Sequence, residues 1–128
     1  MLLEILFSLI VLCAGYATLR TLGLAKGAVA ETFRGLSGIG DLVLSCTAGQ
    51  SRNYALGLAL GRGESVADAL AGQRSVVEGI ATAAAVAGLA ARLAIELPIT
   101  AAVDGVLHRG MAIDMMIEAL LSRPYRSE

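Results

Sequence analysis

Aromatic residues, charge and cysteine are all scarce in this sequence of 128 residues. Aromatic residues make up 4% of the chain, without tryptophan, and charged residues make up 16%, below the roughly 25% of a typical soluble domain. The net charge of −1 offers no basic field for nucleic acid, so we expect no nucleic-acid partner. The two cysteines, Cys13 and Cys46, are too few for a disulfide framework or a metal site. They are interpreted as small apolar fillers, which predicts no bound metal and favours a reducing, cytoplasmic location.

The chain is instead rich in alanine, leucine and glycine, and 56% of its residues are hydrophobic. This excludes intrinsic disorder, and the length suits one domain. The segment 5–19 carries no charge, but it is shorter than the roughly 20 residues that span a bilayer. Only Glu4 precedes it as a charge, whereas a secretory signal needs basic residues there. We expect a helix that the rest of the protein or a partner covers, and membrane insertion is the less favoured alternative.

Glycine and proline divide the remaining chain into segments with helical patterns. The segment 41–46 is too short to classify and could be a strand or a compact helix. No segment shows the sustained two-residue alternation of a hairpin, so the predicted fold class is all-α. The expected helical segments are a short turn at 31–34 and helices at 51–60, 65–70, 77–93, 99–108 and 112–122.

Several residues indicate where these helices begin and end. Ser65, three residues before Asp68, is typical of an N-cap, and Pro98 suits the first turn of the next helix. The glycine cluster 35–40 is expected to end the preceding turn and to leave the backbone flexible before Asp41. His108 stands at a predicted helix C-terminus, where we expect it to contact the last carbonyls of its own helix rather than take part in catalysis.

The glycine-rich segments do not form a nucleotide-binding motif. Gly35, Gly38 and Gly40 follow the order G-x-x-G-x-G, which reverses the Rossmann order, and no hydrophobic strand precedes them. The segment 57–63 lacks the Lys-Ser/Thr pair of a phosphate loop. The sequence therefore predicts that this chain does not contain its own Rossmann domain.

The segment Ser51, Arg52 and Asn53 is the first candidate site. Ser51 is a good N-cap, and a helix N-terminus exposes unpaired amides and the positive end of the helix dipole. An arginine there adds a planar fork that binds phosphate oxygens in a bidentate manner. From spacing alone, a capped surface helix with a solvated arginine is the competing interpretation.

Two carboxylates are further candidates. Asp41 could be brought to a cleft by the glycines before it, although an N-cap role for the following segment is the ordinary alternative. Glu78 lies between Val77 and Gly79 in an apolar neighbourhood, where a charge marks either a helix start or a site.

Three stretches together resemble one known family. These stretches are ETFRGLSGIGDLVLSCTAGQSRNYALGLALGRG, SVVEGIATAAAV and LPITAAVDGVLHRG, and the closing ALLSRPYRSE follows in the same order. They resemble the C-terminal domain of bacterial NAD(P)-dependent glycerol-3-phosphate dehydrogenase over residues 17–128. That resemblance implies an all-helical domain similar to the C-terminal domain of 6-phosphogluconate dehydrogenase-like proteins. Residues 1–16 depart from the family pattern and are assigned as an atypical apolar start of the first helix.

The resemblance also implies a reaction and a set of site residues. The family interconverts sn-glycerol 3-phosphate and dihydroxyacetone phosphate, with NAD or NADP carrying the hydride. Asp41 corresponds to a supporting aspartate of the catalytic cleft, which orients the catalytic lysine and the substrate hydroxyls. The substrate-binding set is then Asp41, Ser45, Ser51, Arg52 and Asn53, and the cofactor-binding set is Arg52, Val76 and Glu78.

The family's general base is a lysine in a K-N motif roughly fifty residues before the aspartate, and this sequence has no room for it ahead of Asp41. Lys26 stands in a different context, and a second substrate-binding lysine and the Rossmann motif are absent. We therefore expect a substrate-binding domain that is inactive alone and whose partners are the substrate and a Rossmann domain. The alternatives are a non-catalytic helical module that self-associates, for example as a homodimer, and a small protein anchored in a membrane by residues 2–19.

Overall fold

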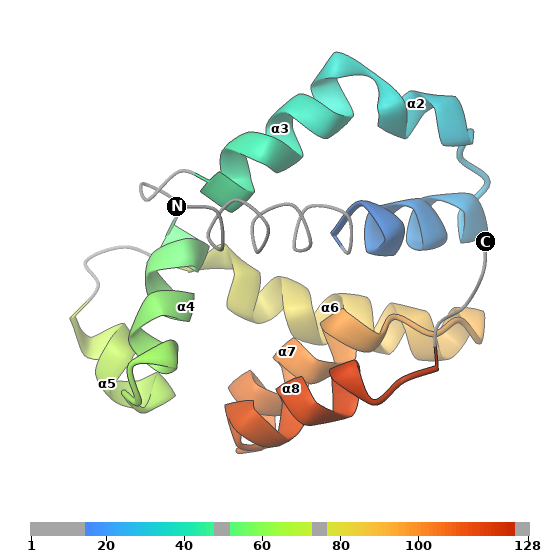
Figure 1. Cartoon of the computed structure of the whole chain (residues 1–128). Coiled ribbons are helices and arrows are strands. Elements are labelled where there is room, and N and C mark those ends of the chain that lie inside the picture. Colours follow the sequence, from blue (N-terminus) through green and yellow to red (C-terminus); the bar gives the residue numbers. More distant parts are fainter. Residues whose placement is uncertain (1–14, 48–51, 73–76, 125–128) are drawn as a thin grey trace.

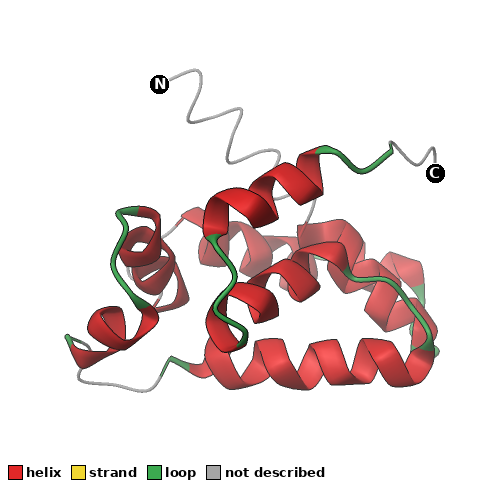
Figure 2. Ribbon diagram, turned by 90° about the horizontal axis from the view of Figure 1, so that it is seen from below, coloured by secondary structure: helices red, strands yellow, loops and turns green. Residues whose placement is uncertain are grey.

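The computed structural model describes residues 15–47, 52–72 and 77–124, and every regular element in these ranges is a helix (Figures 1 and 2). The predicted all-α fold class is thereby confirmed. Residues 15–25 are helical. The later helices are α2 (Ala30–Arg34), α3 (Leu36–Thr47), α4 (Arg52–Gly61), α5 (Val66–Ala71), α6 (Glu78–Leu93), α7 (Pro98–His108) and α8 (Ile113–Leu121).

The helix of residues 15–25 lies against α2 and α3. The ring of Phe33 occupies the space beside Gly23 where a side chain would otherwise stand, and Leu42 lies beside Gly15. The earlier residue, Phe33, contacts the end of the first helix, and the later residue, Leu42, contacts its beginning. Helix α3 therefore runs antiparallel to residues 15–25. Glycine at position 23 lets Phe33 pack directly against the helix backbone, whereas a side chain at position 15 would meet Leu42 only at ordinary contact distance.

The glycine cluster 35–40 ends the preceding turn as predicted, with Gly35 as the C-cap of α2, but it does not leave the backbone flexible. Gly35 alone interrupts the helices, and its carbonyl accepts the backbone N–H of Gly38 and of Ile39, each at 3.0 Å. Helix α3 therefore begins directly after this bend and continues through Gly40 and Asp41. The expectations of a flexible loop and of an N-cap role for Asp41 are wrong, because the main-chain hydrogen bonds of the helix compensate for its glycines. The open choice at 41–46 resolves to a helix.

The later helices form two groups, with α4 packed on α5 and α6 packed on α7, which in turn contacts α8 (Figure 1). Ser65 caps α5 as predicted, since its Oγ accepts the Asp68 backbone N–H at 3.1 Å. Pro98 occupies the first turn of α7, where its missing N–H costs no helical hydrogen bond. The predicted helices from residue 65 onward are all present, with ends that differ by about a residue.

The core of the described part is small. Leu56, Ala69 and Val77 form its buried centre, with Ile80 and Leu107 among the apolar side chains around it. Many large apolar side chains remain at the surface instead, most prominently Leu36, which is 94% exposed, and Leu121, which is 81% exposed. Only part of the apolar side chains of the described residues is therefore buried in this core.

Among the described residues, no helix combines the length and the apolar character needed to cross a membrane. The predicted covered helix at 5–19 lies largely outside the described residues, as does most of the segment 2–19 considered as an anchor.

Candidate functional site

The N-terminal ends of α4 and α6 meet in space, and this meeting point is the candidate site. Arg52 and Asn53 are the first two residues of α4, and both are exposed. The Oδ1 atom of Asn53 accepts the backbone N–H of Gly79 at 3.0 Å, across 26 residues of sequence. Asn53 and Glu78, which were singled out separately in the sequence, therefore lie at adjoining helix ends.

The contact between α4 and α6 depends on glycine at position 79. A Cβ atom built on Gly79 would collide with the Asn53 side-chain amide, meeting its Oδ1 first and its Cγ at 2.9 Å. With a larger residue at position 79 the Asn53 amide would have to turn away, so glycine permits the hydrogen bond between the two helix ends.

Glu78 is the first residue of α6 and is exposed. The sequence left two interpretations of this carboxylate, a helix start or a site residue. The structure places it at the helix start, where a negative charge interacts favourably with the helix dipole. It also directly precedes Gly79, the residue that Asn53 contacts. Its backbone carbonyl also accepts the hydroxyl of Thr82, one helical turn later, at 3.0 Å. Both interpretations of Glu78 are compatible with this position.

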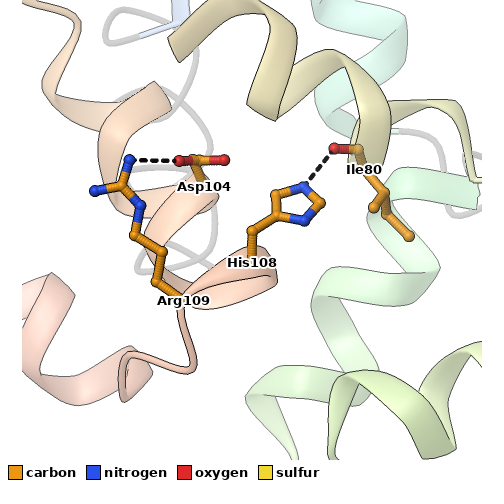
Figure 3. A network of polar contacts seen from close by, with 4 residues as sticks. All are labelled: Ile80, Asp104, His108 and Arg109. Carbon is orange, nitrogen blue, oxygen red and sulfur yellow. Dashed lines mark hydrogen bonds and ion pairs between the residues drawn. The ribbon is translucent and has the colours of Figure 1, made fainter. Parts of the chain in front are cut away.

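His108 of α7 contacts Ile80, the residue of α6 that follows Gly79. Its Nε2 lies 2.8 Å from the carbonyl oxygen of Ile80, and because a carbonyl only accepts, Nε2 carries the proton in this contact (Figure 3). The expectation that His108 contacts the carbonyls of its own helix is wrong, since α7 packs its C-terminal end on the first turn of α6. The start of α6 is thus held at Gly79 by α4 and at Ile80 by α7.

An apolar groove of about 430 Å³ extends from this meeting point between α4, α7 and α8. Asn53 and Gly79 line its polar end, whereas Leu56, Met116 and Leu120 are among the apolar side chains that line the rest. Helix α8 contributes Ile113, Met116, Ile117 and Leu120 to this lining, whereas Leu121 of the same helix is exposed and does not line the groove.

The structure does not unite all the predicted site residues. Asp41 is exposed in the middle of α3, and within the described chain it forms no hydrogen bond or ion pair with Arg52, Asn53 or Glu78. Ser45 also belongs to α3, but its side chain is outside the described part. Ser51 and Val76 lie outside the described residues altogether, so their predicted roles stay predictions.

One buried polar residue was not singled out from the sequence. Asp104 of α7 is 5% exposed, and its Oδ2 lies 3.2 Å from Nη2 of Arg109 (Figure 3). The available signal was a lone acid within the apolar segment 97–107, five residues before an arginine. Because buried carboxylates are paired, this spacing could have suggested the contact.

A family model and individual relatives both match this chain to glycerol-3-phosphate dehydrogenase. The family model of the NAD-dependent glycerol-3-phosphate dehydrogenase C-terminus matches residues 7–118. Glycerol-3-phosphate dehydrogenase (NAD(P)+) of Rhodospirillum rubrum is 53% identical over 117 residues, which are 91% of this chain and 34% of that protein. The corresponding protein of Caulobacter vibrioides is 49% identical over 118 residues, covering 92% of this chain and 36% of that protein.

A solved structure agrees with the sequence relatives. The crystal structure of glycerol-3-phosphate dehydrogenase from Coxiella burnetii superimposes with a TM-score of 0.82 and 38% sequence identity, covering 88% of this chain and 34% of that one. The chain thus spans about a third of the length of the relatives that it matches. The family match begins at residue 7, and the predicted division at residue 16 stays a prediction. This chain belongs to the NAD-dependent glycerol-3-phosphate dehydrogenase C-terminal family.

Proposed function

We propose that this chain is the substrate-binding helical part of an oxidoreductase that interconverts sn-glycerol 3-phosphate and dihydroxyacetone phosphate with NAD or NADP. The observation that carries the proposal is the hydrogen bond from Gly79 to Asn53. It places the segment that the resemblance assigns to the substrate phosphate beside the segment that it assigns to the dinucleotide. The relatives, which are glycerol-3-phosphate dehydrogenases, support the same activity.

The chemistry at the start of α4 suits a phosphate group. The first amides of a helix point outward without helical partners, and the helix dipole adds positive potential there. Arg52 supplies a guanidinium whose parallel N–H groups match phosphate oxygens, and the Asn53 side chain supplies a neutral donor. In this proposal Ser51 completes the phosphate site, while Asp41 and Ser45 contact the substrate hydroxyls.

The start of α6 offers groups that fit a dinucleotide. The exposed carboxylate of Glu78 can accept hydrogen bonds from hydroxyl or amide groups, and Arg52 can reach toward cofactor phosphate from the neighbouring helix end. Bound NAD or NADP would accept or supply the hydride of the reaction. We further propose that Val76 contributes an apolar contact to the cofactor, that the cofactor binds mainly through a Rossmann domain, and that the protein is cytoplasmic.

Binding without turnover is expected of the 128-residue chain. Lys26, exposed in the turn after the helix of residues 15–25, stands in a different sequence context from the family's general-base lysine, which proton transfer requires. Isothermal titration calorimetry with sn-glycerol 3-phosphate should detect phosphate-dependent binding, with glycerol as the ligand control. Addition of NAD or NADP should produce no change in nicotinamide absorbance.

Arg52→Ala should weaken this binding by about tenfold or more, since a hydrogen bond to a charged group contributes roughly 1.5–3 kcal/mol. Arg62→Ala is the matched control, because Arg62 is an exposed arginine just past the opposite end of α4. Equal affinity of the wild type and Arg52→Ala would contradict the phosphate site, and robust turnover by the pure chain would contradict the assignment as a substrate-binding part only.

A self-associating module is the second candidate function. The exposed apolar side chains of α3 and α8, including Leu36, Leu44 and Leu121, are the observation that favours it. Apolar surfaces of this kind are buried in homodimers or against another domain, and the two functions are compatible.

A further inference from the structure

Helix α6 begins without a cap of its own. Its N-cap residue is Val77, which makes no side-chain hydrogen bond to the helix. A valine side chain has no acceptor, whereas the first N–H groups of every helix need one from outside the helical ladder. The acceptor for α6 must therefore come from another element or from solvent.

Asn53 of α4 provides that acceptor. In an ordinary cap, the side-chain oxygen of the N-cap residue accepts the N–H of the second or third helical residue. Gly79 is the second residue of α6, and its N–H donates to Asn53 Oδ1 at 3.0 Å. The bond has the role of an N-cap, but it is made by a residue of a different helix.

This bond determines which way the Asn53 amide faces. A backbone N–H can only donate, so the oxygen of the amide must face Gly79 and its nitrogen must face elsewhere. Within the described part of the chain, Nδ2 donates no hydrogen bond, and Asn53 is exposed at the start of α4. Its two protons are consequently available at the helix end where the phosphate site is proposed.

We propose that Gly79 is a positioning residue for substrate binding: its N–H, capped from α4 by Asn53, orients the Asn53 amide so that Nδ2 donates to the substrate phosphate. The proposal rests on the proposed function. It also implies that the start of α6, including Glu78, and the phosphate site move together, because one side chain joins them.

Three substitutions separate the cap from the phosphate contact. Asn53→Asp keeps an acceptor for Gly79 but replaces the donor by a second oxygen. Asn53→Ala removes both acceptor and donor. Gly79→Ala leaves Asn53 unchanged, but its methyl group collides with the Asn53 amide. Gly88→Ala is the matched control, because Gly88 lies in the same helix and a Cβ there meets nothing within 4 Å.

Thermal denaturation by circular dichroism measures the cap. Gly88→Ala should raise the Tm, since alanine is the better helix former. Asn53→Asp should keep the wild-type Tm or raise it, because a carboxylate also favours the helix N-terminus. Asn53→Ala and Gly79→Ala should lower the Tm. A Gly79→Ala chain that gains stability as Gly88→Ala does, or an Asn53→Asp chain as unstable as Asn53→Ala, would overturn the cap.

Calorimetry with sn-glycerol 3-phosphate measures the positioning. Asn53→Asp and Asn53→Ala should bind about tenfold or more weakly than the wild type. Gly79→Ala should also lose affinity, although it keeps every proposed phosphate ligand. If Gly79 had a purely structural role, this variant would bind normally at temperatures where the chain is folded. Wild-type affinity in folded Gly79→Ala would refute the positioning role. Absence of binding by the wild type would refute the proposed function and the role of Nδ2, while the Tm order would still decide the cap.

Discussion

Removing Arg109 should destabilise this protein more than removing its ionic partner Asp104. The two side chains form one ion pair, with 3.2 Å between Arg109 Nη2 and Asp104 Oδ2. Their surroundings differ sharply, because the Asp104 side chain is 8% exposed and the Arg109 side chain is 66% exposed. The pair therefore predicts an asymmetry between Arg109→Ala and Asp104→Ala.

The magnitude follows from what each substitution leaves behind. Arg109→Ala leaves a nearly buried carboxylate without its cation, and an unsatisfied buried polar group costs about 1–3 kcal/mol, more when charged. Asp104→Ala leaves a guanidinium that water already reaches, so the loss should stay below about 1 kcal/mol. The backbone cap of α7 is retained in both variants, since it is the N–H of residue 109 that bonds to the Gly105 carbonyl.

Far-UV circular dichroism during heating provides the assay. At roughly 3–6 °C per kcal/mol for a domain of this size, Arg109→Ala should lower the Tm by about 5–10 °C, whereas Asp104→Ala should stay within a few degrees of the wild type. The double variant should resemble Asp104→Ala. Arg123→Ala is the control, because its pair with Glu96 is solvated on both sides and should contribute little. Equal losses for the two single variants, or a larger loss for Asp104→Ala, would refute the reasoning.

Two further outcomes are expected. Ser65→Ala should lower the stability by about 1 kcal/mol, because the Asp68 N–H loses its capping oxygen, and a Tm unchanged relative to a Ser122→Ala control would contradict the cap. The chain should also self-associate, and Leu36→Glu together with Leu121→Glu should shift it toward the monomer in light scattering. A wild type that remains strictly monomeric at high concentration would contradict this expectation.

Much of the helical arrangement along the chain was predictable because its signals are local. The cap at Ser65, the proline at the start of α7 and the apolar spacing of α8 each act within one or two helical turns. The glycines of 35–40 misled the prediction, since their local preference for flexibility is weaker than the continuous hydrogen bonding of α3.

The candidate site could be predicted only as separate parts. The residue types at 52–53 were compatible with a phosphate site and Glu78 with a helix start or a site, while the dinucleotide role of Glu78 came only from the family resemblance. Their adjacency depends on a hydrogen bond across 26 residues, for which no periodicity or cap motif gives a signal. Likewise, the partner of His108 lies 28 residues away, on the turn of α6 that α7 happens to cover.

The sequence by itself determined the all-α class, most helix limits and the family, because these depend on local patterning and on residue identity. The tertiary structure alone decided that Asn53 accepts the Gly79 N–H at the start of α6, that Asp104 is buried beside Arg109, and that Asp41 lies within α3 without a contact to Asn53. The physical reason is that helix formation responds to neighbours within a few residues, whereas the pairing of helix ends depends on packing between distant segments, as where the Asn53 side chain lies against the backbone of Gly79.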